Sequence, residues 1–231
     1  ELLDHMSRRV NFQGPGFSTI SRRVPARAGD SFWRVLDRFS KEEVAAATQR
    51  VLERAVVPFV DFWVRQTGIR TIAVAGGVFA NVKLNQRIAS LDSVDSLWVK
   101  PHMGDGGLSA GAALGSAGAT PTLLTDAYLG TDAAAKGIRS ALSVAELPWQ
   151  KTPKVHERVA EMLAEGSVVA RCGGPMEWGP RALSNRSILA SPFDSGINDW
   201  LNERLKRSEF MPFAQIVRAE DAHRWFLGIE K

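Results

Sequence analysis

The sequence predicts an α/β protein built around a parallel sheet. Two short runs of apolar and β-branched residues, 69–75 and 96–100, each end in a glycine-rich turn, and helical segments precede, separate and follow them. The order helix, strand, helix, strand, helix is typical of a parallel crossover unit. The 231 residues, 45% of them hydrophobic and seven of them tryptophan, suffice for one large or two small domains with a core.

Composition excludes several classes of protein. No stretch of about 18 uncharged apolar residues is present, which excludes a membrane-spanning helix, and the first residues lack the basic start and apolar run of a signal peptide. The single cysteine, Cys172, excludes an internal disulfide framework and indicates a reducing, cytoplasmic location. The chain begins without methionine and ends without a terminating element, so we expect it to be part of a longer protein.

The first half contains the strongest helix signal. Residues 1–39 show turn formers and little periodicity, with a short helix expected at 32–38. Ser40 and Glu43 form a capping box, in which each side chain satisfies a free backbone N–H group of the other. The long helix that follows ends at Gly68 and has one apolar stripe. The stripe consists of Val44, Val51, Ala55, Phe59 and Phe62 or Trp63.

The predicted crossover unit comes next. A buried strand is expected at 69–75, a helix at 81–89 and a second strand at 96–100. A glycine-rich loop at 104–107 then leads into a helix of small residues that ends near Ala117.

A turn-rich segment, 120–132, is predicted to connect two domains, 1–130 and 131–231. The second domain is expected to contain further helices and two strands. The helices are predicted at 133–142, 154–165, 198–205 and 220–226, and the strands at 167–172 and 187–190.

The end of the first strand is a candidate binding turn, formed by Gly76 and Gly77 and followed by Asn81. Glycines let a ligand approach the backbone, and the next helix would direct free N–H groups at it. Asn81 is suited to hydrogen-bond a ribose or a phosphate. A tight turn packed for structural reasons explains the same residues, so both interpretations stay open. The spacing matches neither a Walker loop nor a dinucleotide-binding fingerprint.

The end of the second strand carries Gly104, Asp105, Gly106 and Gly107. An aspartate among glycines at the start of a helix is suited to bind a divalent metal, with His102 nearby, although an aspartate at this position is also a common helix cap. Because successive parallel strands end at one edge of a sheet, both glycine-rich turns are expected to open on the same edge, where α/β folds bind ligands.

Residues 174–191, the arginine turn, are the most informative stretch. Arg181 and Arg186 follow glycine and proline turns, which would direct their guanidinium groups at phosphate or carboxylate oxygens. A surface turn with solvated charges is the alternative. Cys172, just before the turn, is expected to be an inert core residue at the end of a buried strand, because no paired histidine is evident.

The motifs taken together resemble the bacterial O-carbamoyltransferases that modify nodulation factors and antibiotics. The resemblance rests on Gly-Gly-Val-Phe-Ala-Asn at 76–81, on 104–113, and above all on Met-Glu-Trp-Gly-Pro-Arg-Ala-Leu-Ser-Asn-Arg-Ser-Ile-Leu at 176–189. Phe-Met-Pro-Phe-Ala at 210–214 adds to it. The first two motifs also resemble the threonylcarbamoyl-transferases that act on tRNA.

The resemblance implies two partial domains. The first would be the C-terminal lobe of an actin-like ATPase domain of the hsp70 and sugar-kinase type. The second would be the start of a domain similar to the threonylcarbamoyl-AMP synthases. In such proteins ATP and carbamoyl phosphate give carbamoyl-adenylate and pyrophosphate, and the carbamoyl group then passes to a hydroxyl of a sugar or another small molecule.

The same resemblance assigns site residues. Arg181, Asn185 and Arg186 would bind carbamoyl phosphate or the adenylate. The nucleotide would lie against the glycine-rich turns, and Asp105 would hold Mg, Fe or Zn with ligands from a lobe that this chain lacks. The turn residues concerned are Gly76, Gly77, Asn81, Gly104, Gly106 and Gly107. Ser184 and Met211 depart from the glycine and arginine that such proteins usually have there.

Two other functions remain open at this point. A tRNA threonylcarbamoyl-transfer protein shares the first motifs, but the basic residues do not form a stripe with aromatics, and the arginine turn follows in the order of the O-carbamoyltransferases. A fragment that binds an anion without turnover is the third hypothesis. The acceptor, the metal and the oligomeric state are not specified by the sequence.

Overall fold

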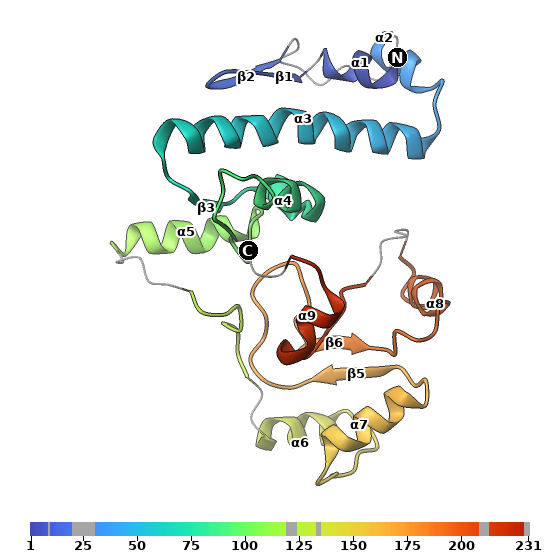
Figure 1. Cartoon of the computed structure of the whole chain (residues 1–231). Coiled ribbons are helices and arrows are strands. Elements are labelled where there is room, and N and C mark those ends of the chain that lie inside the picture. The colour runs from blue at the N-terminus through green and yellow to red at the C-terminus, as the bar shows by residue number, and fades with distance from the viewer. Residues whose placement is uncertain (9, 20–30, 119–123, 133–134, 208–212, 229–231) are drawn as a thin grey trace. The chain divides into compact units, whose positions relative to one another are not determined.

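The computed structural model describes residues 1–8, 10–19, 31–118, 124–132, 135–207 and 213–228 (Figure 1). The chain divides into two compact units, Glu1–Ser109 and Ala110–Ile229. The predicted boundary at residue 130 and the likeness to an actin-like lobe and a threonylcarbamoyl-AMP synthase stay predictions.

The first unit contains helices, a hairpin and a pair of parallel strands. Its elements are α1 (Leu2–Ser7), β1 (Val10–Gln13), β2 (Gly16–Thr19), α2 (Ser31–Leu36), α3 (Lys41–Thr67), β3 (Thr71–Val74), the 3-10 turn η1 (Gly77–Ala80), α4 (Val82–Ala89) and β4 (Ser96–Val99). Helix α5 (Gly106–Ser116) begins in this unit.

Helix α3 begins and ends as its sequence predicts. The N–H of Glu43 donates to Ser40 Oγ at 3.1 Å, and the N–H of Ser40 donates to Glu43 Oε2 at 2.9 Å, which confirms the capping box. At the other end Gly68 adopts a left-handed conformation, with φ of 70°, and its N–H donates to the carbonyl of Val64 at 2.9 Å.

The N-terminal region contains more structure than its lack of periodicity indicated. Strands β1 and β2 pair as an antiparallel hairpin, which the sequence analysis missed. Phe12 of the hairpin meets Phe59 and Phe62 of α3 edge to face, with ring centroids 6.2 and 6.1 Å apart. These contacts join elements distant in sequence, so local patterns could not reveal them. Residues 20–30 of the predicted turn region lie outside the described residues.

The predicted parallel pair is confirmed: β3 and β4 run parallel, with Thr71 opposite Ser96 and Val74 opposite Val99. The expectation that the first strand is buried is wrong, because its side chains alternate between exposed and half-buried. The described part of this sheet has two strands, so neither strand is enclosed by neighbours on both edges.

The described core lies mainly in the first unit. Leu84 and Ile88 of α4 are fully buried, with Val94 close to fully buried just before β4. A second cluster joins α1, α2 and the start of α3 through Leu2 and Leu36. Of ten buried hydrophobic side chains among the described residues, eight belong to the first unit. No helix in the described ranges has the length and apolar character that a membrane crossing requires.

The second unit combines helices with an antiparallel pair of strands. Its elements are α6 (Ala135–Val144), α7 (Val155–Ala164), β5 (Val169–Cys172), β6 (Arg186–Leu189), α8 (Ile197–Arg204), η2 (Ala219–Asp221) and α9 (Ala222–Trp225). Every predicted helix and strand of this region has a counterpart, although residues 133–134 lie outside the described part of the chain.

The expectation that Cys172 is a core residue is wrong. Its side chain is exposed, as are those of Ala170 and Arg171, so β5 is not the buried strand that was predicted. β5 and β6 form a two-stranded sheet, so one edge of β5 has no partner among the described strands.

A polar network joins α3 to the loop before β4. Asp61 accepts hydrogen bonds from Arg65 Nε at 2.8 Å and from the buried Ser93 hydroxyl at 2.5 Å. Arg70 donates to both carboxylate oxygens of Asp95, at 2.9 and 2.6 Å, and to the backbone carbonyl of Asp92 at 2.8 Å. The network fixes the end of α3 relative to β4.

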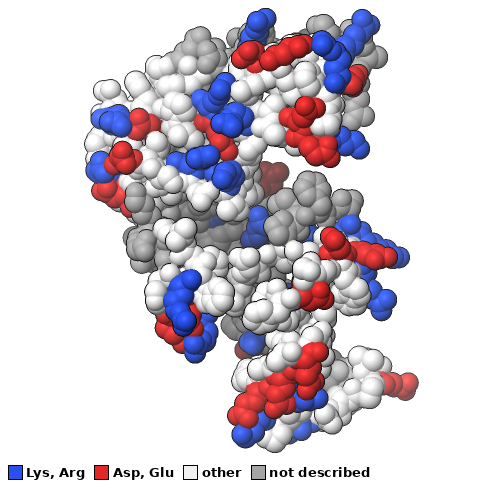
Figure 2. All heavy atoms as spheres, turned by 45° about the vertical axis from the view of Figure 1, so that its right-hand side comes forward, with Lys and Arg blue, Asp and Glu red and all other residues white. Residues whose placement is uncertain are grey.

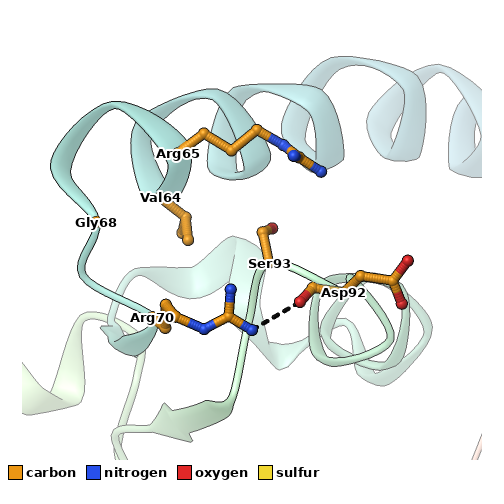
Figure 3. Close-up of a pocket in the computed structure, with 6 residues that line it drawn as sticks. All are labelled: Val64, Arg65, Gly68, Arg70, Asp92 and Ser93. Atoms are coloured by element: carbon orange, nitrogen blue, oxygen red, sulfur yellow. Dashed lines mark hydrogen bonds between the residues drawn. The ribbon is translucent and has the colours of Figure 1, made fainter.

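Part of this network lines a cavity of about 290 Å³ (Figure 3). Its lining residues are Val64, Arg65, Gly68, Arg70, Asp92 and Ser93. Arg65 and Arg70 approach it from α3 and from the residue before β3, with Ser93 between them. Both guanidinium groups already bind carboxylates of this unit. The cavity therefore belongs to the polar network that holds the end of α3 against the loop before β4, which we call the clamp.

We predict that Asp61→Ala lowers the free energy of unfolding by about 1–3 kcal/mol at pH 7, because the buried Ser93 hydroxyl loses its acceptor. Hydrogen bonds from Arg65 and Ser93 lower the pKa of Asp61 below its ordinary value of 3.8. The difference in free energy of unfolding between wild type and variant should therefore be complete above pH 3.8 and become smaller as the pH falls further. Urea unfolding from pH 7 to pH 3 measures both effects.

Asp37→Ala is the matched control, because this exposed carboxylate follows α2 and no hydrogen bond joins it to another described side chain. Its effect should stay within about 0.5 kcal/mol. Equal effects of the two substitutions would contradict the clamp.

Candidate functional site

The arginine turn is organised by the carboxylate of Glu177. Its Oε1 atom accepts hydrogen bonds from the backbone N–H groups of Leu183, Asn185 and Arg186, at 3.0, 2.7 and 3.0 Å. One oxygen atom thus binds three donors from the far end of the turn. The chain between Glu177 and Leu183 is thereby closed into a loop.

These hydrogen bonds shift the acidity of Glu177. Partial burial raises the pKa of its carboxyl, but the backbone N–H groups of Glu177 itself, Arg186, Leu183 and Asn185 outweigh burial and lower the pKa to about 2. The contribution of Glu177 to stability is therefore complete above its ordinary pKa of 4.5 and is lost as the pH falls toward 2. At neutral pH the carboxylate is ionised.

Two of the predicted site residues brace the backbone of the turn. Asn185 Nδ2 donates to the carbonyl of Pro175 at 2.8 Å. Arg186 Nη1 donates to the carbonyls of Gly174 and Asn185, at 2.9 and 3.0 Å. Both side chains hold the two ends of the turn together.

Arg181 lies differently. It is exposed, in the loop between Glu177 and Leu183, and in the described parts of the chain no hydrogen bond or ion pair engages its side chain. A planar guanidinium is able to bind two oxygens of an anion at once. The structure thus brings Arg181, Asn185 and Arg186 together in one turn but gives them different partners.

The segment 127–131 lies along the turn and belongs to the same unit. Gly130 N donates to the carbonyl of Met176 at 2.9 Å, and Met176 N donates to the carbonyl of Thr131 at 3.2 Å. The Tyr128 hydroxyl donates to the carbonyl of Leu183 at 2.8 Å. A Cβ atom on Gly130 would lie 2.5 Å from Met176 Cβ, so the close approach requires glycine.

Sequence reasoning missed Glu177 and Tyr128. Glu177 stands inside the quoted motif, and an acidic residue beside a Gly-Pro turn is a usable signal for an acceptor of backbone N–H groups. Tyr128 gives no comparable signal, because its partner is 55 residues away.

Ser184 adopts a left-handed backbone conformation with φ of 84°, which explains why glycine suits this position. Its N–H donates to Ser187 Oγ at 3.0 Å, so the turn holds Ser184 in this conformation. Met211, the other departure, lies outside the described residues.

In the first unit, the two glycine-rich turns meet at one edge of the β3–β4 pair, as predicted. Gly76 N donates to the carbonyl of Met103 at 2.7 Å, and a Cβ on Gly104 would lie 4.0 Å from Gly77 Cα. Gly76 has φ of 116°, which glycine alone adopts readily.

Asn81 has structural partners for both polar atoms of its side chain. Its Oδ1 accepts from Leu84 N at 3.0 Å and caps α4, and its Nδ2 donates to Gln49 Oε1 of α3 at 2.7 Å. These contacts support the interpretation of 76–81 as a turn packed for structural reasons. Its predicted contact with a nucleotide stays a prediction.

Gly106 and Gly107 pack against His102. A Cβ on Gly106 would lie 2.1 Å from the imidazole, and one on Gly107 would lie 2.2 Å from the His102 carbonyl. Asp105 is exposed beside them. Within the described ranges, no three His, Cys, Asp or Glu side chains are grouped to hold a metal ion. The role of Asp105 as a metal ligand stays a prediction.

We predict that Ser184→Gly raises the free energy of unfolding by about 1 kcal/mol, because glycine removes the steric cost of the left-handed conformation. Thermal or urea unfolding measures the change. Ser195→Gly is the control, an exposed position without positive φ, where no stabilisation is expected. An unchanged or lower free energy of unfolding of Ser184→Gly would contradict the claim that Ser184 is strained in its left-handed conformation.

Comparison with known proteins connects both units to one family. Residues 21–114 match the family model described as carbamoyltransferase N-terminus, and residues 160–231 match the model described as carbamoyltransferase C-terminus. The second match contains the whole arginine turn. The first contains both glycine-rich turns.

Individual relatives agree with the family models. Nodulation protein NolNO of Sinorhizobium fredii is 31% identical over 98% of this chain and 34% of its own length. An uncharacterized protein of Methanocaldococcus jannaschii is 36% identical over 82% of this chain and 33% of its own length. The 3'-hydroxymethylcephem-O-carbamoyltransferase of Streptomyces clavuligerus is 31% identical over 80% of this chain and 35% of its own length.

The chain thus spans about a third of the length of these curated relatives. It matches both terminal parts of the family in the expected order, the glycine-rich turns first and the arginine turn second. The chain belongs to the carbamoyltransferase family.

Proposed function

We propose that the protein takes part in ATP-dependent O-carbamoyl transfer, with carbamoyl phosphate as the donor and a hydroxyl of a sugar or another small molecule as the acceptor. Family membership supports the carbamoyl group as the group that is transferred. The name of the Streptomyces relative, an O-carbamoyltransferase, supports a hydroxyl oxygen as the acceptor atom. The observation that carries the proposal is the exposed Arg181 guanidinium on a braced turn.

The chemistry of the donor suits such a guanidinium. Carbamoyl phosphate and ATP carry several anionic oxygens, and a planar arginine fork can bind two of them at once. Negative charge grows on the leaving oxygen when a carbonyl–oxygen bond breaks, and a fixed cation stabilises it. Arg181 is the candidate for this contact, while Asn185 and Arg186 hold the turn in place.

The transfer that we propose proceeds through carbamoyl-adenylate, which forms from carbamoyl phosphate, ATP and water with release of inorganic phosphate and pyrophosphate. The acceptor hydroxyl oxygen attacks the carbonyl carbon and forms the new carbon–oxygen bond. The bond to the phosphate oxygen of AMP breaks, AMP leaves with the electron pair, and the hydroxyl proton is released. The hydroxyl becomes a carbamate ester.

We place the nucleotide of the transfer step at the edge of the β3–β4 pair where the two glycine-rich turns meet. Gly76, Gly77 and Gly104 leave backbone uncovered by side chains there, beside the start of α4. Asp105 is proposed as one oxygen ligand of a divalent cation whose other ligands lie outside the described residues.

Threonylcarbamoyl transfer to tRNA is less well supported. On the face drawn in Figure 2, lysine and arginine side chains lie among aspartate and glutamate side chains and do not gather in one broad basic area. Nucleic-acid binding relies on such areas. The match of residues 160–231 to the carbamoyltransferase C-terminus also favours the small-molecule acceptor.

We predict that carbamoyl phosphate binds the chain through Arg181, so that Arg181→Ala weakens binding at least about tenfold through loss of a charge-assisted contact. Isothermal titration calorimetry with wild type and variant measures the affinity. Arg139→Ala on α6, also an exposed arginine of the second unit, is the matched control and should bind like wild type. Equal binding by all three proteins, or none by any, would remove Arg181 from the proposal.

Pyrophosphate release distinguishes the two transfer reactions. Release that requires both ATP and carbamoyl phosphate is expected. Release that requires threonine and bicarbonate instead would overturn O-carbamoyl transfer and favour the tRNA reaction.

A further inference from the structure

We infer that Glu177 is a positioning residue for Arg181: its carboxylate closes the loop that carries the guanidinium and thereby sets the affinity for the anionic donor. This inference deepens the proposed function and rests on it. Glu177 itself would not touch the donor.

The connectivity of the loop supports this role. Glu177 precedes Arg181, whereas the donors to its Oε1 atom, the N–H groups of Leu183, Asn185 and Arg186, all follow it. Arg181 is therefore tethered on both sides within a short span of chain. Such a span has few conformations, so the guanidinium loses less entropy when it binds an anion.

The same contacts decide which groups can meet the ligand. Convergent backbone N–H groups in a turn often form a site for an external anion. Here the N–H groups of Leu183, Asn185 and Arg186 converge on the internal carboxylate of Glu177. The oxygens of carbamoyl phosphate would therefore bind the Arg181 side chain, whereas these three amides stabilise the turn through Glu177.

Tyr128 holds the loop from its other side. Leu183 donates its N–H to Glu177 and accepts a hydrogen bond at its carbonyl from the Tyr128 hydroxyl. Both backbone polar groups of the residue that closes the loop are thus fixed. Tyr128→Phe removes the second contact alone and tests whether loosening from this side has the same effect.

Glu177→Gln is the principal test, because glutamine keeps the oxygen acceptor and the size of the side chain but removes the charge. Hydrogen exchange should show faster exchange at the amides of Leu183, Asn185 and Arg186 in the variant. Titration with carbamoyl phosphate should show an affinity about tenfold lower than wild type. Glu157→Gln, an exposed carboxylate of α7 paired with Lys154, is the control and should change neither.

The Arg181→Ala background separates positioning from general stability. If Glu177 acts through Arg181, then Glu177→Gln should lower the affinity in the wild type and have no further effect when Arg181 is absent. Equal losses in both backgrounds would overturn the inference, as would unchanged exchange at the three amides. Failure of the wild type to bind carbamoyl phosphate would overturn the proposed function, whereas the exchange measurement would still decide whether Glu177 closes the loop.

Discussion

The convergence of three backbone N–H groups on one oxygen of Glu177 is the interaction on which the arginine turn depends. A turn of this length between two short strands has many conformations, and most of them would leave its N–H groups to water. An ionised carboxylate that accepts several charge-assisted hydrogen bonds selects one of them. The placement of Arg181, Asn185 and Arg186 follows from that selection.

The turn and the segment beside it form one hydrogen-bonded unit. Tyr128 binds the backbone carbonyl of Leu183, and the backbone of Gly130 and Thr131 binds that of Met176. Ser184 is kept in a left-handed conformation by this framework, a local cost that the surrounding contacts sustain. In the resulting turn, Glu177, Asn185 and Arg186 bind the backbone, and the guanidinium of Arg181 is exposed.

Local rules predicted the elements that local chemistry specifies. The capping box at Ser40 and the end of α3 at Gly68 are confirmed, because caps and helix-ending glycines act within a few residues. The parallel pairing of β3 with β4 is confirmed as well, because a strand, a helix and a strand in this order form a parallel crossover unit. The hairpin β1–β2 is itself local, with Gln13 opposite Gly16 across the Gly14-Pro15 turn, and it was missed because the residues on either side of the turn show little periodicity. The exposure of Cys172 could not be predicted, since it depends on which segments distant in sequence cover β5. Arg181, Asn185 and Arg186 were found from their residue types. Which of them bind the backbone of the turn could not be predicted, because the carbonyls that accept their hydrogen bonds lie up to twelve residues away in the sequence.

The central claim is that backbone N–H groups bind the ionised Glu177 carboxylate. Its most direct test is an NMR titration of the Glu177 side-chain carboxyl carbon in the folded chain. The account predicts a pKa of about 2, because the protonated acid would lose its hydrogen bonds from Leu183, Asn185 and Arg186. A midpoint near the ordinary value of 4.5 would contradict it, because such a carboxyl would be bound no better in the fold than in water.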